Sequence, residues 1–97
     1  MLVAEYQITY WRNIPSMLVV KDAEQTIKGI LPSRFQEAID EAAMRLGETD
    51  SDSYLAGWNK GPWLPSEGEL SQIGEKLVAE LEAEFTEEKL NEIISNL

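Results

Sequence analysis

The residues of this chain that could take part in chemistry are carboxylates, lysines, hydroxyls and tryptophans, because it contains neither histidine nor cysteine. Histidine is the commonest general base and transition-metal ligand, and cysteine supplies disulfides, thiolate zinc sites and thiol nucleophiles. No serine and lysine stand at a spacing known from catalytic pairs, and carboxylates along a helix are usually only solvated. We therefore expect no catalytic residue, no metal ion and no cofactor, and we predict that the chain is not an enzyme.

Two stretches match known ion-binding motifs only in part. Asp50 and Asp52 alternate as the first two ligands of an EF-hand loop do, but Tyr54 occupies the position of the third ligand. The glycine-containing segment 57–61 lacks the spacing of a phosphate-binding loop. We therefore predict that the acidic pair belongs to the cap of a short helix that runs from Asp52 to about Trp58.

A corner near the N-terminus carries the first candidate binding residues, Trp11 and Arg12. Tyr6, Ile8 and Tyr10 alternate with Gln7, Thr9 and Trp11, a pattern that predicts a half-buried strand. Residues 13–16 contain the turn formers Asn, Pro and Ser. We expect Trp11 to pack against the helix that contains Phe35 or against the segment around Trp58. We expect Arg12 to pair with a carboxylate or with backbone carbonyls.

A second tryptophan-rich segment, residues 57–65, supplies Trp58, Asn59 and Trp63 as further candidates. Its glycines and prolines predict irregular structure. The favoured interpretation is a loop that folds back over the open edge of the core, and the alternative is an exposed aromatic patch, because tryptophan is enriched at binding hot spots. Met44 falls opposite the apolar stripe of its helix and is a further candidate contact, although single exposed apolar residues often have no role.

Charge is distributed unevenly along the chain, whose net charge is −10. Residues 1–46 carry five basic and six acidic side chains, whereas residues 47–97 carry three basic and twelve acidic ones. The acidic half would repel nucleic acid and anionic membranes and would attract a basic protein. Solubility alone is the simpler explanation. We expect a protein partner, which the charge suggests is basic, and no nucleic acid.

The length of 97 residues suits a single domain with a sheet part, residues 1–31, and a helical part, residues 32–97. No apolar run is long enough to span a membrane, and the N-terminus lacks the pattern of a signal peptide. The absence of cysteine fits a reducing compartment. We therefore expect a soluble, cytoplasmic protein without membrane insertion.

Three strands are predicted in the first third of the chain. The alternating residues up to Trp11 form the first, the apolar run Met17–Val20 forms a central second, and residues 25–30 form the third. The predicted fold class is α+β, with a small three-stranded, mostly antiparallel sheet that three to four helices cover on one face.

The helices are predicted to begin at N-cap residues Ser33, Ser66 and Thr86, the first two within capping boxes. The first helix is expected to stop at Gly47, a typical residue after a helix end. The last helix is expected to dock on its own domain and return towards Leu77, with a partner protein as the alternative surface. Apolar stripes mark the buried faces: Phe35, Ile39, Ala42, Ala43 and Leu46; Leu70, Ile73, Leu77, Leu81 and Phe85; Leu90, Ile93, Ile94 and Leu97.

Several of these segments together resemble a small bacterial domain family named virulence factor. The segments are Ile8–Pro15, Leu31–Asp40, Ala42–Arg45 and Asp52–Trp58. The family pattern has Asp at the position of Asn13 and Gln at that of Met17, so the resemblance assigns no role to these two residues. The resemblance implies a domain that occurs alone or attached to a larger virulence-linked protein, and it implies no catalytic residue.

These observations favour an accessory or regulatory protein that acts by binding another protein. The rival interpretation is a small-molecule or cofactor-binding domain in which Trp11, Arg12, Trp58 and Trp63 line a pocket and Arg12 holds an anion. An enzyme that uses carboxylates is a third alternative. A concave pocket around the aromatic residues would favour the rival, and a flat exposed patch would favour protein interaction.

Overall fold

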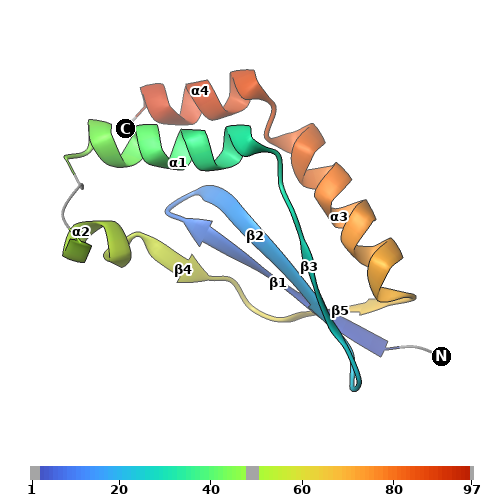
Figure 1. Cartoon of the computed structure of the whole chain (residues 1–97). Helices are drawn as coiled ribbons and strands as arrows, with labels where there is room; N and C mark the ends of the chain where they lie inside the picture. The colour runs from blue at the N-terminus through green and yellow to red at the C-terminus, as the bar shows by residue number, and fades with distance from the viewer. Residues whose placement is uncertain (1–2, 48–50, 97) are drawn as a thin grey trace.

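The computed structural model describes residues 3–47 and 51–96 and shows an α+β protein in which helices cover one face of an antiparallel sheet (Figure 1). The elements are β1 (Val3–Trp11), β2 (Ile14–Lys21), β3 (Thr26–Gly29), α1 (Ser33–Arg45), α2 (Ser51–Ala56), β4 (Trp58–Lys60), β5 (Leu64–Glu67), α3 (Leu70–Glu84) and α4 (Glu87–Ser95). The predicted fold class is confirmed, but the described residues form five strands where the sequence pattern predicts three.

The two additional strands both pair with β1, on the side opposite β2. β4 pairs with the C-terminal part of β1 and β5 pairs with its N-terminal part. Between them, the amide of Gly61 donates to the carbonyl of Ile8 at 2.9 Å, and the side-chain amide of Gln7 donates to the carbonyl of Gly61 at 3.0 Å. Pro62 and Trp63 then both lie opposite Gln7, so β4 and β5 are two halves of one edge strand interrupted by a bulge.

The prediction that residues 57–65 are irregular is therefore wrong for residues 58–60 and 64–65, which form strands, and holds for residues 61–63. Pro62 lies in the bulge and Pro65 lies in an edge strand, and a missing amide hydrogen is tolerated at both kinds of position. Pairing with β1 uses backbone groups, which every residue type except proline supplies in full. β4 and β5 are also short and mostly exposed, so no alternation of side chains reveals the pairing.

The hairpin of β1 and β2 turns at Arg12 and Asn13. Arg12 has a φ of 53°, a left-handed conformation that costs about 1–2 kcal/mol for a residue other than glycine. The predicted break at residues 13–16 is shorter than expected, because Pro15 already belongs to β2. Ser16 is the extra residue of a bulge in the β1–β2 ladder. Pro15 lies outside the part of β2 that pairs with β3, so its missing amide hydrogen is on an unpaired edge.

The predicted N-caps are confirmed only at α4. There the hydroxyl of Thr86 accepts a hydrogen bond from the amide of Lys89 at 3.2 Å, as an N-cap does. The capping boxes predicted at Ser33 and Ser66 are wrong, because α1 already includes Ser33 and α3 begins only at Leu70. Ser66 instead pairs in β5, so sheet pairing with β1 has taken the residue that would cap a longer helix.

The core has two clusters, one at each end of the hairpin. Near the turn, Trp11 and Ile14 pack against α1 and α4, which lie side by side in Figure 1. At the other end, Leu18 and Val20 pack against α3, which crosses β2 and β3. The predicted stripes of α1 and α3 are buried or half-buried, and Gly47 follows α1 with a φ of 70°.

The last helix docks on its own chain, as predicted, but on α1 and not beside α3. Leu90 and Ile94 are 2% and 3% exposed and belong to the cluster that contains Ala38 and Ala42 of α1. Phe85 turns the chain at the end of α3 and packs on Phe35, with ring centroids 6.2 Å apart. None of the helices in the described stretches is long and apolar enough to cross a bilayer.

Candidate functional site

Trp11 is an anchor of the core and not part of an exposed surface. Its side chain is 0% exposed and packs against α1 and the Trp58 segment, which confirms the expected packing. The indole Nε1 donates to the carbonyl of Tyr54 at 2.8 Å, and the two rings lie 5.9 Å apart. A Cβ at Gly57 would lie 2.5 Å from the indole, so glycine is needed for this approach. Trp11 therefore joins β1 of the sheet to α2 through its contacts with Tyr54.

Arg12 and Asn59 lie beside this anchor, at the surface of the hairpin turn. The guanidinium of Arg12 lies 5.5 Å from the centre of the Trp11 ring, and its backbone amide donates to the carbonyl of Gly57 at 2.8 Å. The Asn59 side chain donates to the Gly57 carbonyl at 3.4 Å. A hollow of about 430 Å³ opens here, with these lining residues: Trp11, Arg12, Asn13, Ile14, Ala42, Asn59 and Ile93.

The other predicted site residues do not join this hollow. Trp58 is half-buried and packs edge-on against Tyr54, with ring centroids 5.9 Å apart, so it helps to close the core. Trp63 is 38% exposed, and the ammonium of Lys21 lies 4.2 Å from the centre of its ring. Met44 is 65% exposed on α1. The two tryptophans of the segment thus lie in different surroundings: Trp58 packs against the core and Trp63 lies at the surface.

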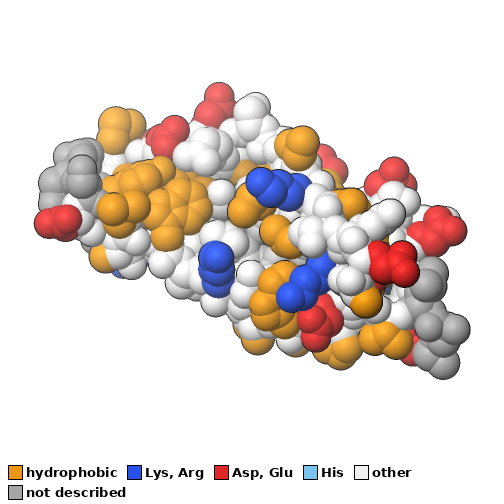
Figure 2. Space-filling view, turned by 60° about the horizontal axis from the view of Figure 1, so that its bottom comes forward, with side chains coloured by type: hydrophobic (Ala, Val, Ile, Leu, Met, Phe, Trp, Pro, Cys, Tyr) orange, Lys and Arg blue, Asp and Glu red, His pale blue; other side chains and the backbone are white. Residues whose placement is uncertain are grey.

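The sheet face that carries Trp63 is the face that α1, α3 and α4 leave uncovered. The strand register places Lys21, Lys28 and Lys60 on this side of the sheet, together with Glu5 and Glu67. Figure 2 turns the underside of Figure 1 towards the viewer and shows Lys and Arg side chains in the middle of that side, with most carboxylates around its outline. This side therefore differs in charge from the helices, because the three lysines lie on it and most side chains of α3 and α4 that carry a charge are glutamates.

The helices α3 and α4 carry most of the negative charge. Within residues 70–95 there are seven glutamates and two lysines, a net charge of −5. All of these glutamates are exposed except Glu82, which is half-buried. The charge that the sequence assigns to its second half is thus concentrated on one layer of the molecule, where neighbouring carboxylates add to a common negative potential.

A groove between β3 and α3 was not predicted from the sequence. It has a volume of about 500 Å³ and is lined by Ile27, Lys28, Gly29, Ile30, Ser71, Gly74, Glu75, Val78 and Glu82. Gly29 and Gly74 contribute no side chain, and a Cβ at Gly29 would lie 2.9 Å from Val78. The only sequence signal for the groove is this pair of glycines, one on β3 and one on α3. The sequence does not show that these two elements lie next to each other, because that depends on the fold.

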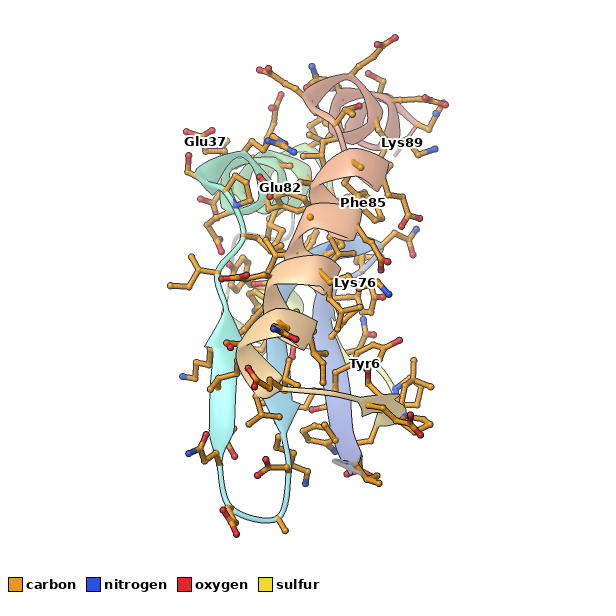
Figure 3. All side chains as sticks on the ribbon, turned by 90° about the vertical axis from the view of Figure 1, so that its right-hand side faces the viewer. Tyr6, Glu37, Lys76, Glu82, Phe85 and Lys89 are labelled. Atoms are coloured by element: carbon orange, nitrogen blue, oxygen red, sulfur yellow. The ribbon has the colours of Figure 1, made fainter. Side chains whose placement is uncertain are left out.

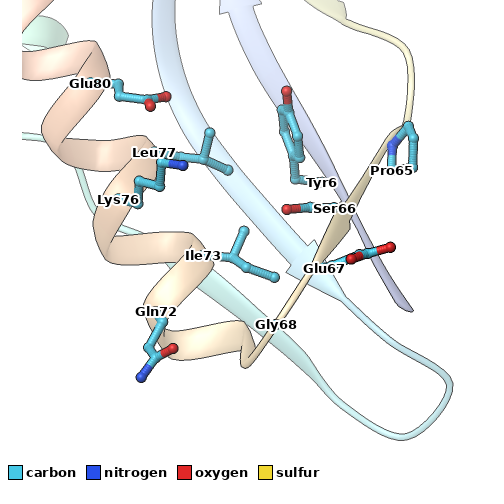
Figure 4. A pocket seen from close by; sticks show the side chains of 10 residues that line it. All are labelled: Tyr6, Pro65, Ser66, Glu67, Gly68, Gln72, Ile73, Lys76, Leu77 and Glu80. Carbon is cyan, nitrogen blue, oxygen red and sulfur yellow. The ribbon is translucent and has the colours of Figure 1, made fainter. Parts of the chain in front are cut away.

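A polar cleft lies on the other side of α3, between that helix and β5. It has a volume of about 390 Å³, and Figure 4 shows Tyr6 and Ser66 on the strand side, facing α3. Lys76 and Glu80 line the helix side. No polar or charged side chain among the described residues is fully buried, so this cleft holds its polar groups in contact with water.

Comparison with known protein families gives one match. A family model described as "Virulence factor" matches residues 9–94. The chain belongs to this family. Searches of curated proteins and of solved structures return no match.

The family match includes the hairpin turn, the tryptophan segment and the β3–α3 groove, so each lies within what the family model describes. The acidic pair Asp50 and Asp52 gives no further information, because Asp50 lies outside the described residues. In the described part of the chain no three acidic side chains converge on a point that a metal ion could occupy. Burial raises the pKa of Tyr10 above 10.0, and the charges of Glu84 and Tyr6 raise it further.

Proposed function

We propose that this virulence factor family member is a non-catalytic accessory protein that acts by binding a protein partner of basic character. The observation that carries the proposal is the concentration of negative charge on the helix layer of the molecule. The helices α3 and α4 hold a net charge of −5, whereas Lys21, Lys28 and Lys60 lie on the uncovered sheet face. A surface of one sign steers and selects a partner of the opposite sign.

The exposure of the polar groups among the described residues favours binding over catalysis. Active sites usually hold ionisable groups in water-excluded positions, where burial and neighbouring charges shift their pKa values. The polar groups that line the cleft at Tyr6 and the hollow at Arg12 remain in contact with water in the described structure. Binding through exposed charge needs no such burial.

The test is capture of partner proteins by the purified chain at low and high salt, with two triple variants. One variant carries Glu80→Gln, Glu84→Gln and Glu92→Gln on α3 and α4. The other carries the same change at three exposed glutamates elsewhere: Glu5, Glu24 and Glu67. Both lose three negative charges, so a difference between them reports the position of the charge and not its amount.

We expect basic proteins to be captured at low salt and lost at high salt, because exposed charges are screened beyond about 8 Å at physiological ionic strength. The helix variant should capture clearly less of the basic partners than the control variant, which should retain most of the capture. Equal capture by the two variants, or capture that salt does not change, would contradict the proposal.

A second candidate function is the binding of a small ligand in the hollow at the hairpin turn. The observation that favours it is the volume of about 430 Å³, which falls within the range of small-molecule pockets, beside Trp11 and Arg12. Native mass spectrometry of the protein purified from its own cells would detect a ligand of defined mass. An Asn59→Ala variant that loses this mass would support the pocket, and a spectrum of the bare chain alone would exclude it.

A further inference from the structure

The outer edge of β3 is an unpaired strand edge. β3 is the last strand of the sheet, and within the described residues it pairs only with β2. Figure 3 shows β3 at the left border of the sheet, with α3 in front of the neighbouring strands and no ribbon beyond β3. Backbone amides and carbonyls on such an edge can pair with an added strand.

The helix α3 runs alongside this edge, so that the strand and the helix form the walls of the β3–α3 groove (Figure 3). Ile27 and Val78 are half-buried and provide apolar surface inside the groove, and Ile30 is 86% exposed at the end of β3. A groove between an edge strand and a helix is a recurring way to bind an extended peptide, which pairs with the strand and places alternate side chains against the helix.

The charges of the groove indicate what kind of segment fits. Glu75 and Glu82 line it on α3, on either side of Val78 along the helix. Lys28 lines it on β3, where the strand register turns its side chain towards the other face of the sheet. They are seven residues apart, which corresponds to about 10.5 Å along a helix. Residues i and i+4 of an extended strand lie on the same face and about 13 Å apart. A strand with basic residues at these two positions and an apolar residue between them therefore matches the two glutamates and the apolar surface.

We propose that the β3–α3 groove binds an extended segment of a partner protein with the pattern basic-x-apolar-x-basic, which adds as a strand to the edge of β3. The apolar side chain packs on Ile27 and Val78, and the two basic side chains pair with Glu75 and Glu82. This site is a finer form of the proposed function, since it names the segment through which a basic partner is recognised.

A second copy of the chain does not match the groove as well. Antiparallel pairing of two β3 edges about a two-fold axis perpendicular to the sheet would place both α3 helices on the same face. Glu75 and Glu82 of one copy would then face the same residues of the other, and like charges at an interface oppose association. The charge of the groove therefore favours a basic segment of another protein.

The probe that tests this inference is the acetylated and amidated peptide Arg-Thr-Val-Thr-Arg, with binding followed by amide chemical shifts of the labelled protein. Two control peptides accompany it: Glu-Thr-Val-Thr-Glu, which reverses the charge, and the Arg peptide with N-methylated backbone amides, which cannot pair with a strand edge. We expect the Arg peptide to shift the amides of residues 26–29 and 71–82, and we expect both control peptides to bind at least about tenfold more weakly.

Protein variants separate the groove from the general charge of the helices. Glu75→Gln with Glu82→Gln should weaken binding of the Arg peptide by about tenfold or more, whereas Glu80→Gln with Glu84→Gln, the same charge change on the same helix away from the groove, should change it little. Ile30→Lys at the exposed end of the groove should also weaken binding, and thermal melting should show that each variant remains folded.

Three outcomes would overturn the inference: equal binding of the N-methylated peptide, shifts confined to α1 and α4, or a concentration-dependent dimer with shifts at β3. If the Arg peptide does not bind but the helix triple variant still loses its basic partners, the groove is wrong and the proposed function stands. If the peptide binds in the groove but partner capture is independent of the glutamates, the charge-based function is wrong and the groove stands.

Discussion

Replacing Gly57 with alanine would place the new Cβ 2.5 Å from both Cε2 and Nε1 of Trp11, well inside van der Waals contact. The indole is 0% exposed and packs against α1, so a movement of the ring disturbs packing that it already makes. Either the ring or the backbone at position 57 must move. Either movement strains the hydrogen bond from Trp11 Nε1 to the carbonyl of Tyr54, which measures 2.8 Å.

Two costs contribute to the expected effect of Gly57→Ala. Adding volume to a filled core costs about 1–3 kcal/mol. Leaving the buried indole donor without its acceptor costs about 1–3 kcal/mol more. We therefore expect the free energy of unfolding to fall by about 2–5 kcal/mol, a large part of the roughly 5–15 kcal/mol by which most domains are stable.

Urea unfolding followed by circular dichroism measures this change directly. Gly47→Ala is a matched control, because Gly47 has a φ of 70° and no heavy atom lies within 4 Å of the position that its Cβ would take. That substitution should cost only about 1–2 kcal/mol, from the left-handed backbone alone.

A double-mutant cycle with Trp11→Phe identifies the cause of the Gly57→Ala effect. Phenylalanine has no Nε1 donor to lose and a smaller ring that can move away from the new Cβ, so the alanine should cost less in the Trp11→Phe background than in the wild type. Additive costs in the cycle, or a Gly57→Ala protein within about 0.5 kcal/mol of the wild type, would show that the steric argument is wrong.

Three further predictions concern α4 and Tyr10. Thr86→Ala should lower the free energy of unfolding by about 1 kcal/mol, since it removes the acceptor of the Lys89 amide, while Thr86→Ser should retain most of it, as thermal or urea unfolding would show. Deletion of residues 87–97 should lower the melting temperature clearly, because two buried side chains worth roughly 1.5–3 kcal/mol each are lost; a truncated protein that melts unchanged would contradict docking on α1. Because the folded protein holds the pKa of Tyr10 above that of the unfolded chain, the folded form binds the phenolic proton more tightly, and this contribution to stability is present below pH 10 and lost as the pH rises through the folded pKa. Tyr10→Phe should therefore lose less stability than the wild type above pH 10, and Glu84→Gln should move the phenolate absorbance of Tyr10 to lower pH; an unchanged alkaline profile in both would contradict this cause.

Local patterns in the sequence determined several parts of this protein before any tertiary contact is considered. The helical spacing of apolar residues identified the buried faces of α1 and α3, and Thr86 marked the start of α4, because a turn of helix and its cap depend on residues three or four positions apart. The alternation before Trp11 identified β1 for the same reason. The composition alone also showed that the chain has no histidine or cysteine to serve as a general base, nucleophile or metal ligand, and that its net charge is −10.

Only the tertiary structure decided where distant segments meet. β4 and β5 exist because their backbone groups pair with β1, some fifty residues earlier in the chain. Both are short and mostly exposed, so no alternation of buried and exposed side chains marks them. The same pairing draws Ser66 into a strand and so prevents it from capping α3. Gly29 and Gly74 line one groove because α3 packs against β3. The missing side chains leave room there only because the fold brings these two elements together.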